Sequence, residues 1–148
     1  MTAKFENNNL IVLNPLSGDK VDTLTVSDEK YINDSILNVK IDSSWPSLSI
    51  SRRISYINKF RKELLKNKKE IASTIKNETG KIDFDITVEI LTSLEHLKQI
   101  ASIAKKALKI QRRNAGLMKT KKAYVKYEPL GVAGVIAPWN YPLATPLT

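Results

Sequence analysis

The sequence predicts an α/β protein in which an N-terminal helical layer with a β arm leads into the first strand of a parallel sheet. Two observations support this fold class. Residues 51–112 carry apolar side chains at helical spacing, whereas residues 132–137 form an almost unbroken apolar run. Such a run is typical of a parallel strand buried on both faces. The composition, 42% hydrophobic and 26% charged, is that of a globular protein.

The first fifty residues are predicted to hold a β-hairpin and a helix. Residues 10–13 and 21–26 have the apolar content of short strands, and Pro15 and Gly18 between them favour a turn. Apolar residues then recur at helical spacing at Ile32, Ile36 and Val39.

Trp45 and Pro46 should interrupt the helical pattern, because a residue before proline is driven out of the α region. Two long helices are predicted after them. The first should span about residues 51–77 and the second about residues 83–112, with Gly80 between them as a left-handed cap. The expected buried positions are Ile54, Ile57, Phe60, Leu64, Ile71 and Ile75 in the first helix, and Ile86, Ile90, Leu94, Leu97, Ala101, Ala104 and Leu108 in the second.

The period of the pattern changes near residue 120. Residues 124–127 have the β-branched and aromatic content of a strand, and residues 132–137 are the predicted buried strand. Residues 138–142 follow as a rigid loop with a proline at each end, and residues 143–148 resemble the first turns of a helix. A buried parallel strand needs neighbouring strands, and the sequence offers too few. We therefore expect this segment to begin an unfinished α/β domain.

The net charge of +9 is concentrated in the last third of the chain. Residues 101–148 carry nine basic side chains and one acidic side chain, and most of the excess lies in residues 105–126. A basic stripe can neutralise phosphates, but single-sign stripes are usually solvated faces. Nucleic-acid binding is therefore only the weaker alternative.

Several classes of protein are excluded or disfavoured by what the sequence lacks. It contains no cysteine, which excludes disulfides, thiolate metal sites and a cysteine nucleophile within these residues. No apolar run approaches the roughly 20 residues that span a bilayer. The first ten residues lack the basic and apolar regions of a secretory signal. We therefore expect a soluble cytoplasmic protein.

Residues 127–143, YEPLGVAGVIAPWNYPL, resemble the aldehyde dehydrogenase superfamily, whose pattern here is approximately E-P-x-G-V-x-x-x-I-x-P-W-N-[FY]-P. Other motifs agree in the same order along the chain. Residues 14–18 resemble the early N-P-x-[ST]-G turn of the family, and residues 78–81 resemble its E-x-G-K. Glu89 falls where the next helix of the family carries E-[VI]. The ordered set covers nearly all of the chain.

The resemblance implies a catalytic role for Asn140. An enzyme that attacks an aldehyde with a thiol must stabilise the oxyanion of a tetrahedral adduct, and an Asn side-chain NH₂ is a suitable neutral donor. Pro138 and Pro142 restrict the backbone on either side of it. The alternative is that Asn140 only caps the following helix or closes an Asx turn.

The resemblance also implies a binding site for NAD or NADP beside this loop. It places Ile136, Ala137, Pro138 and Trp139 at the carboxyl end of the predicted strand, where α/β sheets bind ligands, near the nicotinamide ribose. For Ile136, packing in a core is an equally good explanation. No G-x-G-x-x-G follows the strand, and the family does not use that fingerprint although it is similar to Rossmann proteins.

Residues 1–148 are expected to be the N-terminal part of an aldehyde dehydrogenase domain. Residues 1–120 would form its helical segment, residues 121–127 a strand of the type used in oligomerisation, and residues 131–148 the start of an incomplete Rossmann-like cofactor-binding domain. The implied function is NAD(P)-dependent oxidation of an aldehyde to a carboxylic acid by a full-length protein, expected to be a homo-oligomer. The chain alone should be inactive, because the family's cysteine nucleophile and glutamate base belong to later motifs.

Two other functions remain open from the sequence. A non-catalytic truncated paralogue or interaction protein would use the 121–127 strand, and a nucleic-acid-binding module would use residues 105–126. His96 is expected at the surface or in a supporting position rather than as a base. Glu89 is expected to be a buried structural partner of an arginine or a backbone group and not a catalytic residue. No metal site is expected.

Overall fold

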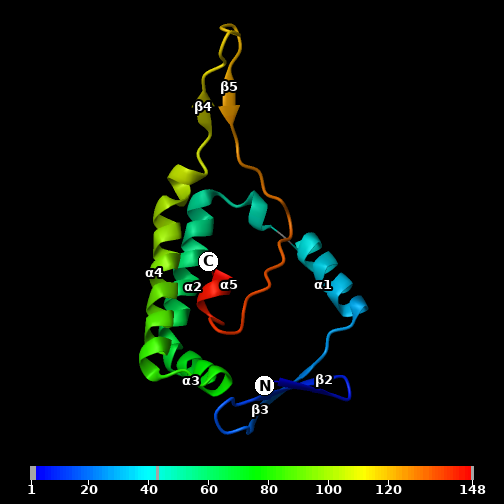
Figure 1. The fold of residues 1–148 in the computed structure, drawn as a ribbon. Coiled ribbons are helices and arrows are strands. Elements are labelled where there is room, and N and C mark those ends of the chain that lie inside the picture. Colours follow the sequence, from blue (N-terminus) through cyan, green and yellow to red (C-terminus); the bar gives the residue numbers. More distant parts are fainter. Residues whose placement is uncertain (1–2, 43, 148) are drawn as a thin grey trace.

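The computed structural model describes residues 3–42 and 44–147, which form an N-terminal sheet, a helical layer and a two-stranded arm (Figure 1). The sheet is antiparallel in the order β1 (Ala3–Glu6), β2 (Asn9–Leu13) and β3 (Lys20–Thr25). The β2–β3 pair confirms the predicted hairpin. Strand β1 was not predicted; it joins β2 through Asn7 and Asn8, which both adopt positive φ. Asn tolerates this conformation better than most residues.

Helix α1 (Glu29–Asp42) follows the sheet, as its apolar spacing predicted. The Asp28 carboxylate caps its start, accepting a hydrogen bond from the backbone N–H of Tyr31 at 2.7 Å. The side chains of Ile32, Ile36 and Val39 remain exposed, so this helix does not bury its apolar side in the described part of the chain. A 3₁₀ turn (Trp45–Ser47) then confirms the predicted interruption.

The helical layer consists of α2 (Ile50–Lys66), α3 (Lys68–Thr79) and α4 (Asp83–Ala107). The prediction of one helix over residues 51–77 is wrong, because the chain breaks at Asn67. Asn67 is the C-cap of α2: besides its backbone N–H, its side-chain amide donates to the carbonyl of Glu63, each at 3.0 Å. The polar run at residues 66–70 also offers no apolar side chain that would keep a continuous buried stripe across the junction.

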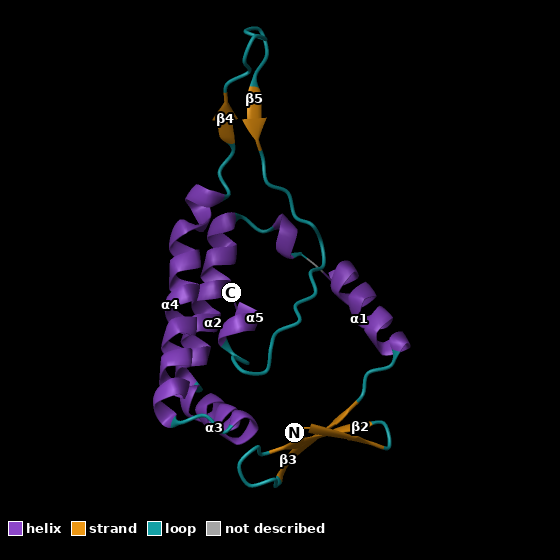
Figure 2. Ribbon diagram, in the orientation of Figure 1, coloured by secondary structure: helices purple, strands orange, loops and turns teal. Residues whose placement is uncertain are grey.

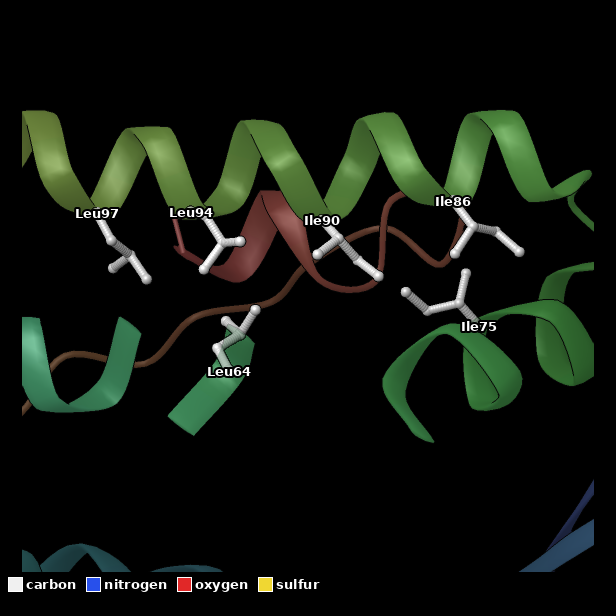
Figure 3. Close-up of a cluster of buried hydrophobic side chains, with 6 residues drawn as sticks. All are labelled: Leu64, Ile75, Ile86, Ile90, Leu94 and Leu97. Atoms are coloured by element: carbon white, nitrogen blue, oxygen red, sulfur yellow. The ribbon is translucent and has the colours of Figure 1, made fainter. Parts of the chain in front are cut away.

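The core lies where α2 and α3 pack against α4 (Figure 3). Leu64 of α2 and Ile75 of α3 face a row of side chains on α4. The row consists of Ile86, Ile90, Leu94 and Leu97. All six were predicted as buried positions, and their burial confirms that prediction. Phe60 and Leu108 were also expected to be buried, but both are exposed, since no described element covers these ends of the stripes.

The arm is an antiparallel pair of β4 (Gln111–Arg113) and β5 (Ala123–Val125), and it projects from the end of the helical layer (Figures 1 and 2). The prediction that α4 continues to residue 112 is wrong. It ends at Ala107, and residues 111–113 pair with β5 instead. The strand predicted at residues 124–127 is present, although it begins at Ala123 and ends at Val125.

The strand predicted at residues 132–137 does not form. These residues have no regular secondary structure, and Ile136 is fully exposed. A β-strand is stabilised by hydrogen bonds to a neighbouring strand. Within residues 3–42 and 44–147 no strand lies beside this segment, so it stays without regular structure. The chain then returns to the helical layer and ends in α5 (Ala144–Leu147), whose Leu147 packs against the core together with Leu143.

Candidate active site

The Glu89 carboxylate joins α4 to the loop that carries Asn140. Its side chain is fully buried, and Oε2 accepts a hydrogen bond from Lys81 Nζ at 2.6 Å. The other oxygen, Oε1, accepts from the backbone N–H groups of Leu143 at 2.9 Å and Ala144 at 3.2 Å. A buried carboxylate is costly unless such partners are present, and here both oxygens are bonded.

Lys81 contacts the loop a second time, through Tyr141. Its Nζ lies 3.9 Å from the centroid of the Tyr141 ring, within the range of a cation–π interaction. The Lys81 side chain is only 16% exposed, which strengthens both of its contacts because little water screens them. Lys81 and Tyr141 were not predicted as part of the site. In the sequence, only their positions in the family motifs at residues 78–81 and 127–143 pointed to them.

The pKa of Glu89 reflects these contacts. Burial acts to raise the pKa, but the hydrogen bond from Lys81, the two backbone N–H groups and the charge of Lys81 together hold it below its ordinary value. The carboxylate is therefore ionised at neutral pH. Glu89 was expected to be a buried structural partner, and the structure confirms this for the backbone groups; the cation is a lysine rather than an arginine.

The early turn at residues 14–18 meets the same region at Gly80. Gly80 caps α3 with φ +70°, and a Cβ placed there would lie 3.1 Å from side-chain atoms of both Pro15 and Leu16. The turn is itself held by the Asn14 side chain, whose Oδ1 accepts from the backbone N–H groups of Leu16 and Ser17. The motifs at residues 14–18, 78–81 and 89, which are separated in the sequence, therefore meet in space.

Asn140 lies in the turn that precedes α5, and its side chain is exposed. Among the described residues its amide makes no hydrogen bond, so it neither caps α5 nor closes an Asx turn there. The four residues before it differ in exposure. Ala137 is half-buried, whereas Ile136, Pro138 and Trp139 are exposed. Core packing, the alternative for Ile136, therefore does not occur within the described chain.

Other candidates lie outside this cluster. His96 is half-buried on α4, and its Nε2 has no hydrogen-bond partner among the described residues. The described part of the chain contains no group of acidic or histidine side chains suited to a metal ion. It also contains no helix with the length and apolarity that a membrane span requires.

The basic stretch is partly gathered at the arm. Five cationic side chains line one shallow pocket there: Arg112, Arg113, Lys119, Lys121 and Lys122. The arm projects away from the helical layer (Figure 1), and its five cations are not among the donors to the Glu89 carboxylate, which are Lys81, Leu143 and Ala144. Any binding of polyanions would therefore use a different surface from the loop at residues 136–140.

Comparison with known proteins shows the family to which the chain belongs. The model of the aldehyde dehydrogenase family matches residues 2–148. An aldehyde dehydrogenase-like protein of Schizosaccharomyces pombe is 33% identical over 110 residues, which are 73% of this chain and 21% of that protein. The chain therefore belongs to the aldehyde dehydrogenase family.

Solved structures give the same fold. A protein of Sinorhizobium meliloti, assigned as a methylmalonate-semialdehyde dehydrogenase and solved with NAD, matches with a TM-score of 0.85 and 22% identity over 96% of this chain. The NADP-dependent glyceraldehyde-3-phosphate dehydrogenase of Bacillus halodurans, solved with NADP, matches with a TM-score of 0.85 and 23% identity over 95%. The predicted α/β class is thus confirmed. The chain spans 29% and 30% of those two chains and so corresponds to part of their fold.

Proposed function

We propose that this chain supplies the oxyanion-binding amide and part of the cofactor site of an NAD(P)-dependent aldehyde dehydrogenase. The observation that carries the proposal is the Asn140 side chain, which is exposed and forms no hydrogen bond within the described chain, although the loop around it is anchored to a buried carboxylate. Membership of the family supports the reaction class. The product would be the carboxylic acid that corresponds to the aldehyde.

The proposed chemistry begins with a thiolate that attacks the aldehyde carbon. The carbon–oxygen double bond becomes a single bond, and the oxygen takes up the negative charge. The Asn140 NH₂ donates a hydrogen bond to this oxygen and so lowers the barrier to the adduct. The thiolate must come from residues outside these 148, because the sequence contains no cysteine. The 148-residue polypeptide alone should therefore be inactive.

The residues before Asn140 fit the proposed cofactor site. Ile136, Pro138 and Trp139 present exposed apolar surface, and the small Ala137 side chain permits close approach of a ring or ribose. NAD(P), when bound, would accept the hydride from the substrate carbon. The acyl group would then remain on sulfur as a thioester, and a water molecule would cleave the carbon–sulfur bond to give the carboxylic acid and return the thiol. The solved relatives carry NAD in one case and NADP in the other, and the proposal therefore includes both cofactors.

We also propose a cellular location and an oligomeric state for this enzyme. It is a cytoplasmic homo-oligomer in which the β4–β5 arm pairs with another subunit, since an exposed strand edge is a ready template for pairing. Non-catalytic interaction through the same arm is the second candidate. It is favoured by the apolar and aromatic side chains that β5 exposes, Tyr124 and Val125.

The test is the rate of aldehyde-dependent NAD(P)H formation by the natural polypeptide, purified at the length at which its source cell makes it. Asn140→Ala should lower kcat by about 10²–10³-fold with a smaller change in KM, because it removes one donor to the developing oxyanion. Asn33→Ala, which removes an exposed amide on α1, is the matched control and should leave kcat unchanged.

Two results would contradict the proposal at different levels. Unchanged kcat in Asn140→Ala would remove the role of Asn140 while leaving an active dehydrogenase. No aldehyde-dependent NAD(P)H formation by the natural polypeptide would remove the enzymatic function itself. A nucleic-acid-binding module would instead show affinity for DNA or RNA that falls steeply with salt and survives Asn140→Ala.

A further inference from the structure

We infer that Lys81 and Glu89 are positioning residues that set the place of the Asn140 amide. The inference rests on the proposed function, since it concerns the orientation of the same donor. Lys81 and Glu89 do not touch the reacting atoms and would affect catalysis only through the loop backbone and the Tyr141 ring.

The contacts fix the loop immediately after Asn140. Tyr141, the next residue, has its ring 3.9 Å from the Lys81 ammonium. Leu143 and Ala144 donate their backbone N–H groups to Glu89, so the start of α5 is tied to α4. Pro142 lies between these contacts and has its φ fixed by its ring. Little backbone freedom therefore remains between Asn140 and α5.

The anchor itself is rigid. Glu89 lies on α4 beside Ile90, with Ile86 one turn earlier, and both of these side chains are in the core. Its carboxylate cannot move without disturbing the most buried surface of the molecule. The loop is thus attached to the core through Glu89, although its own side chains from Pro138 to Tyr141 are exposed.

The carboxylate serves three donors with two oxygens, and this arrangement is sensitive to a small chemical change. In Glu89→Gln one oxygen can still accept from Leu143 and Ala144. The new NH₂ group would face the Lys81 ammonium, and two donors cannot bond to each other. Lys81 would then lose its strongest contact and with it the restraint that holds it at the Tyr141 ring.

The experiment is a double-mutant cycle in the natural, full polypeptide, with kcat expressed per active site after titration of the active sites. Glu89→Gln should lower kcat by about 10–100-fold, which is the effect of misplacing a catalytic group by about 1 Å. In the Asn140→Ala background, Glu89→Gln should cause no further loss, because the donor that it positions is already gone. A purely structural role would lower the number of active sites and leave kcat per site unchanged.

Variants of Lys81 extend the test. Lys81→Met removes the charge and keeps an unbranched chain of similar length, and it should give the same loss and the same lack of additivity. Lys81→Arg retains a cation that can bond Glu89 and lie over the Tyr141 ring, and it should restore most of the activity. If Glu89→Gln does not fold, Lys81→Met takes its place in the cycle, because it leaves the two backbone bonds to Glu89 intact.

The matched control is Glu95→Gln on the same helix. Glu95 pairs with Lys98 at 3.1 Å, and both side chains are more than half exposed. This variant makes the same chemical change outside the cluster and should leave kcat unchanged.

The outcomes separate the inference from the proposed function. If Asn140→Ala lowers kcat but Glu89→Gln and Lys81→Met leave it unchanged, or if their losses multiply with that of Asn140→Ala, the positioning role is overturned. If Asn140→Ala itself has no effect, the proposed role of Asn140 fails and the inference falls with it.

Discussion

Glu89 illustrates how one side chain determines the arrangement of a site. Taking a carboxylate out of water carries a penalty of several kcal/mol, and three donors offset it here. Because those donors come from the α3–α4 connection and from the start of α5, the carboxylate can be satisfied only when both segments are in place. The local chemistry of one residue therefore fixes the relative position of two distant stretches of chain.

The stability that Glu89 contributes should depend on pH. Its pKa in the folded protein lies below the ordinary value, so the contribution is fully present above the unfolded-state pKa of about 4.3 and is lost as the pH falls through the lower folded-state pKa. Glu89→Gln should therefore lower Tm at pH 7, and the difference from wild type should shrink as the pH falls below about 4.

Thermal unfolding of both proteins between pH 3 and pH 7 checks this expectation. Glu95→Gln, in which an exposed carboxylate is changed, should leave Tm almost unaltered at both ends of the range. A Tm difference for Glu89→Gln that stays constant, or that grows toward acid, would contradict the assignment of an ionised, donor-satisfied carboxylate.

At this scale the sequence predicted part of the site. It indicated a buried structural role for Glu89, and the family resemblance singled out Asn140 and residues 136–139, whose roles remain proposals. It did not reveal that Lys81 contacts both Glu89 and Tyr141, because such contacts depend on a tertiary approach that local patterns do not encode.

The buried sides of the helices could be predicted from the sequence, whereas some of the helix ends could not. The apolar stripes of α3 and α4 were predictable because burial against a neighbour imposes a period on the sequence. The break at Asn67 and the end of α4 at Ala107 were not predicted. At the first, the Asn67 side chain caps α2 through the Glu63 carbonyl, and beyond the second, residues 111–113 pair with strand β5. The predicted strand at residues 132–137 failed for the converse reason, because its partners are missing from the described chain.

The cap between α3 and α4 gives a prediction at the level of elements. Gly80 has a φ of +70°, and a Cβ added there would lie 3.1 Å from side-chain atoms of Pro15 and Leu16; Gly18 has a similar φ of +78°, but a Cβ there would meet no atom within 4 Å. Alanine at either position should cost about 1–2 kcal/mol for the left-handed backbone. Gly80→Ala should cost about 1 kcal/mol more, because the stiff Pro15 ring must move.

Urea unfolding of the two variants measures this difference in the free energy of unfolding. Gly18→Ala serves as the matched control for the backbone term. Equal losses in the two variants would show that the turn at residues 14–18 does not depend on close contact with the α3 cap.

Many large apolar side chains are exposed in the described part of the chain. The exposed large apolar side chains include Tyr31, Ile32, Ile36, Leu37 and Val39 of α1, and Leu130, Val132, Val135, Ile136 and Trp139 before Asn140. Where exposed apolar side chains gather in large patches, such surface ordinarily contacts further protein. The proposal assigns that further protein, together with the thiolate nucleophile, to residues outside these 148. The chain spans 21% of the Schizosaccharomyces pombe relative.

Asn140 is proposed to work with a nucleophile that this sequence does not contain. Intact mass spectrometry of the natural product, isolated from its source cell, tests this proposal. We expect a mass several times 16.7 kDa, the mass of these 148 residues. A product of about 16.7 kDa would contradict it, because the cell would then make a chain with an oxyanion donor and no thiolate to generate the oxyanion.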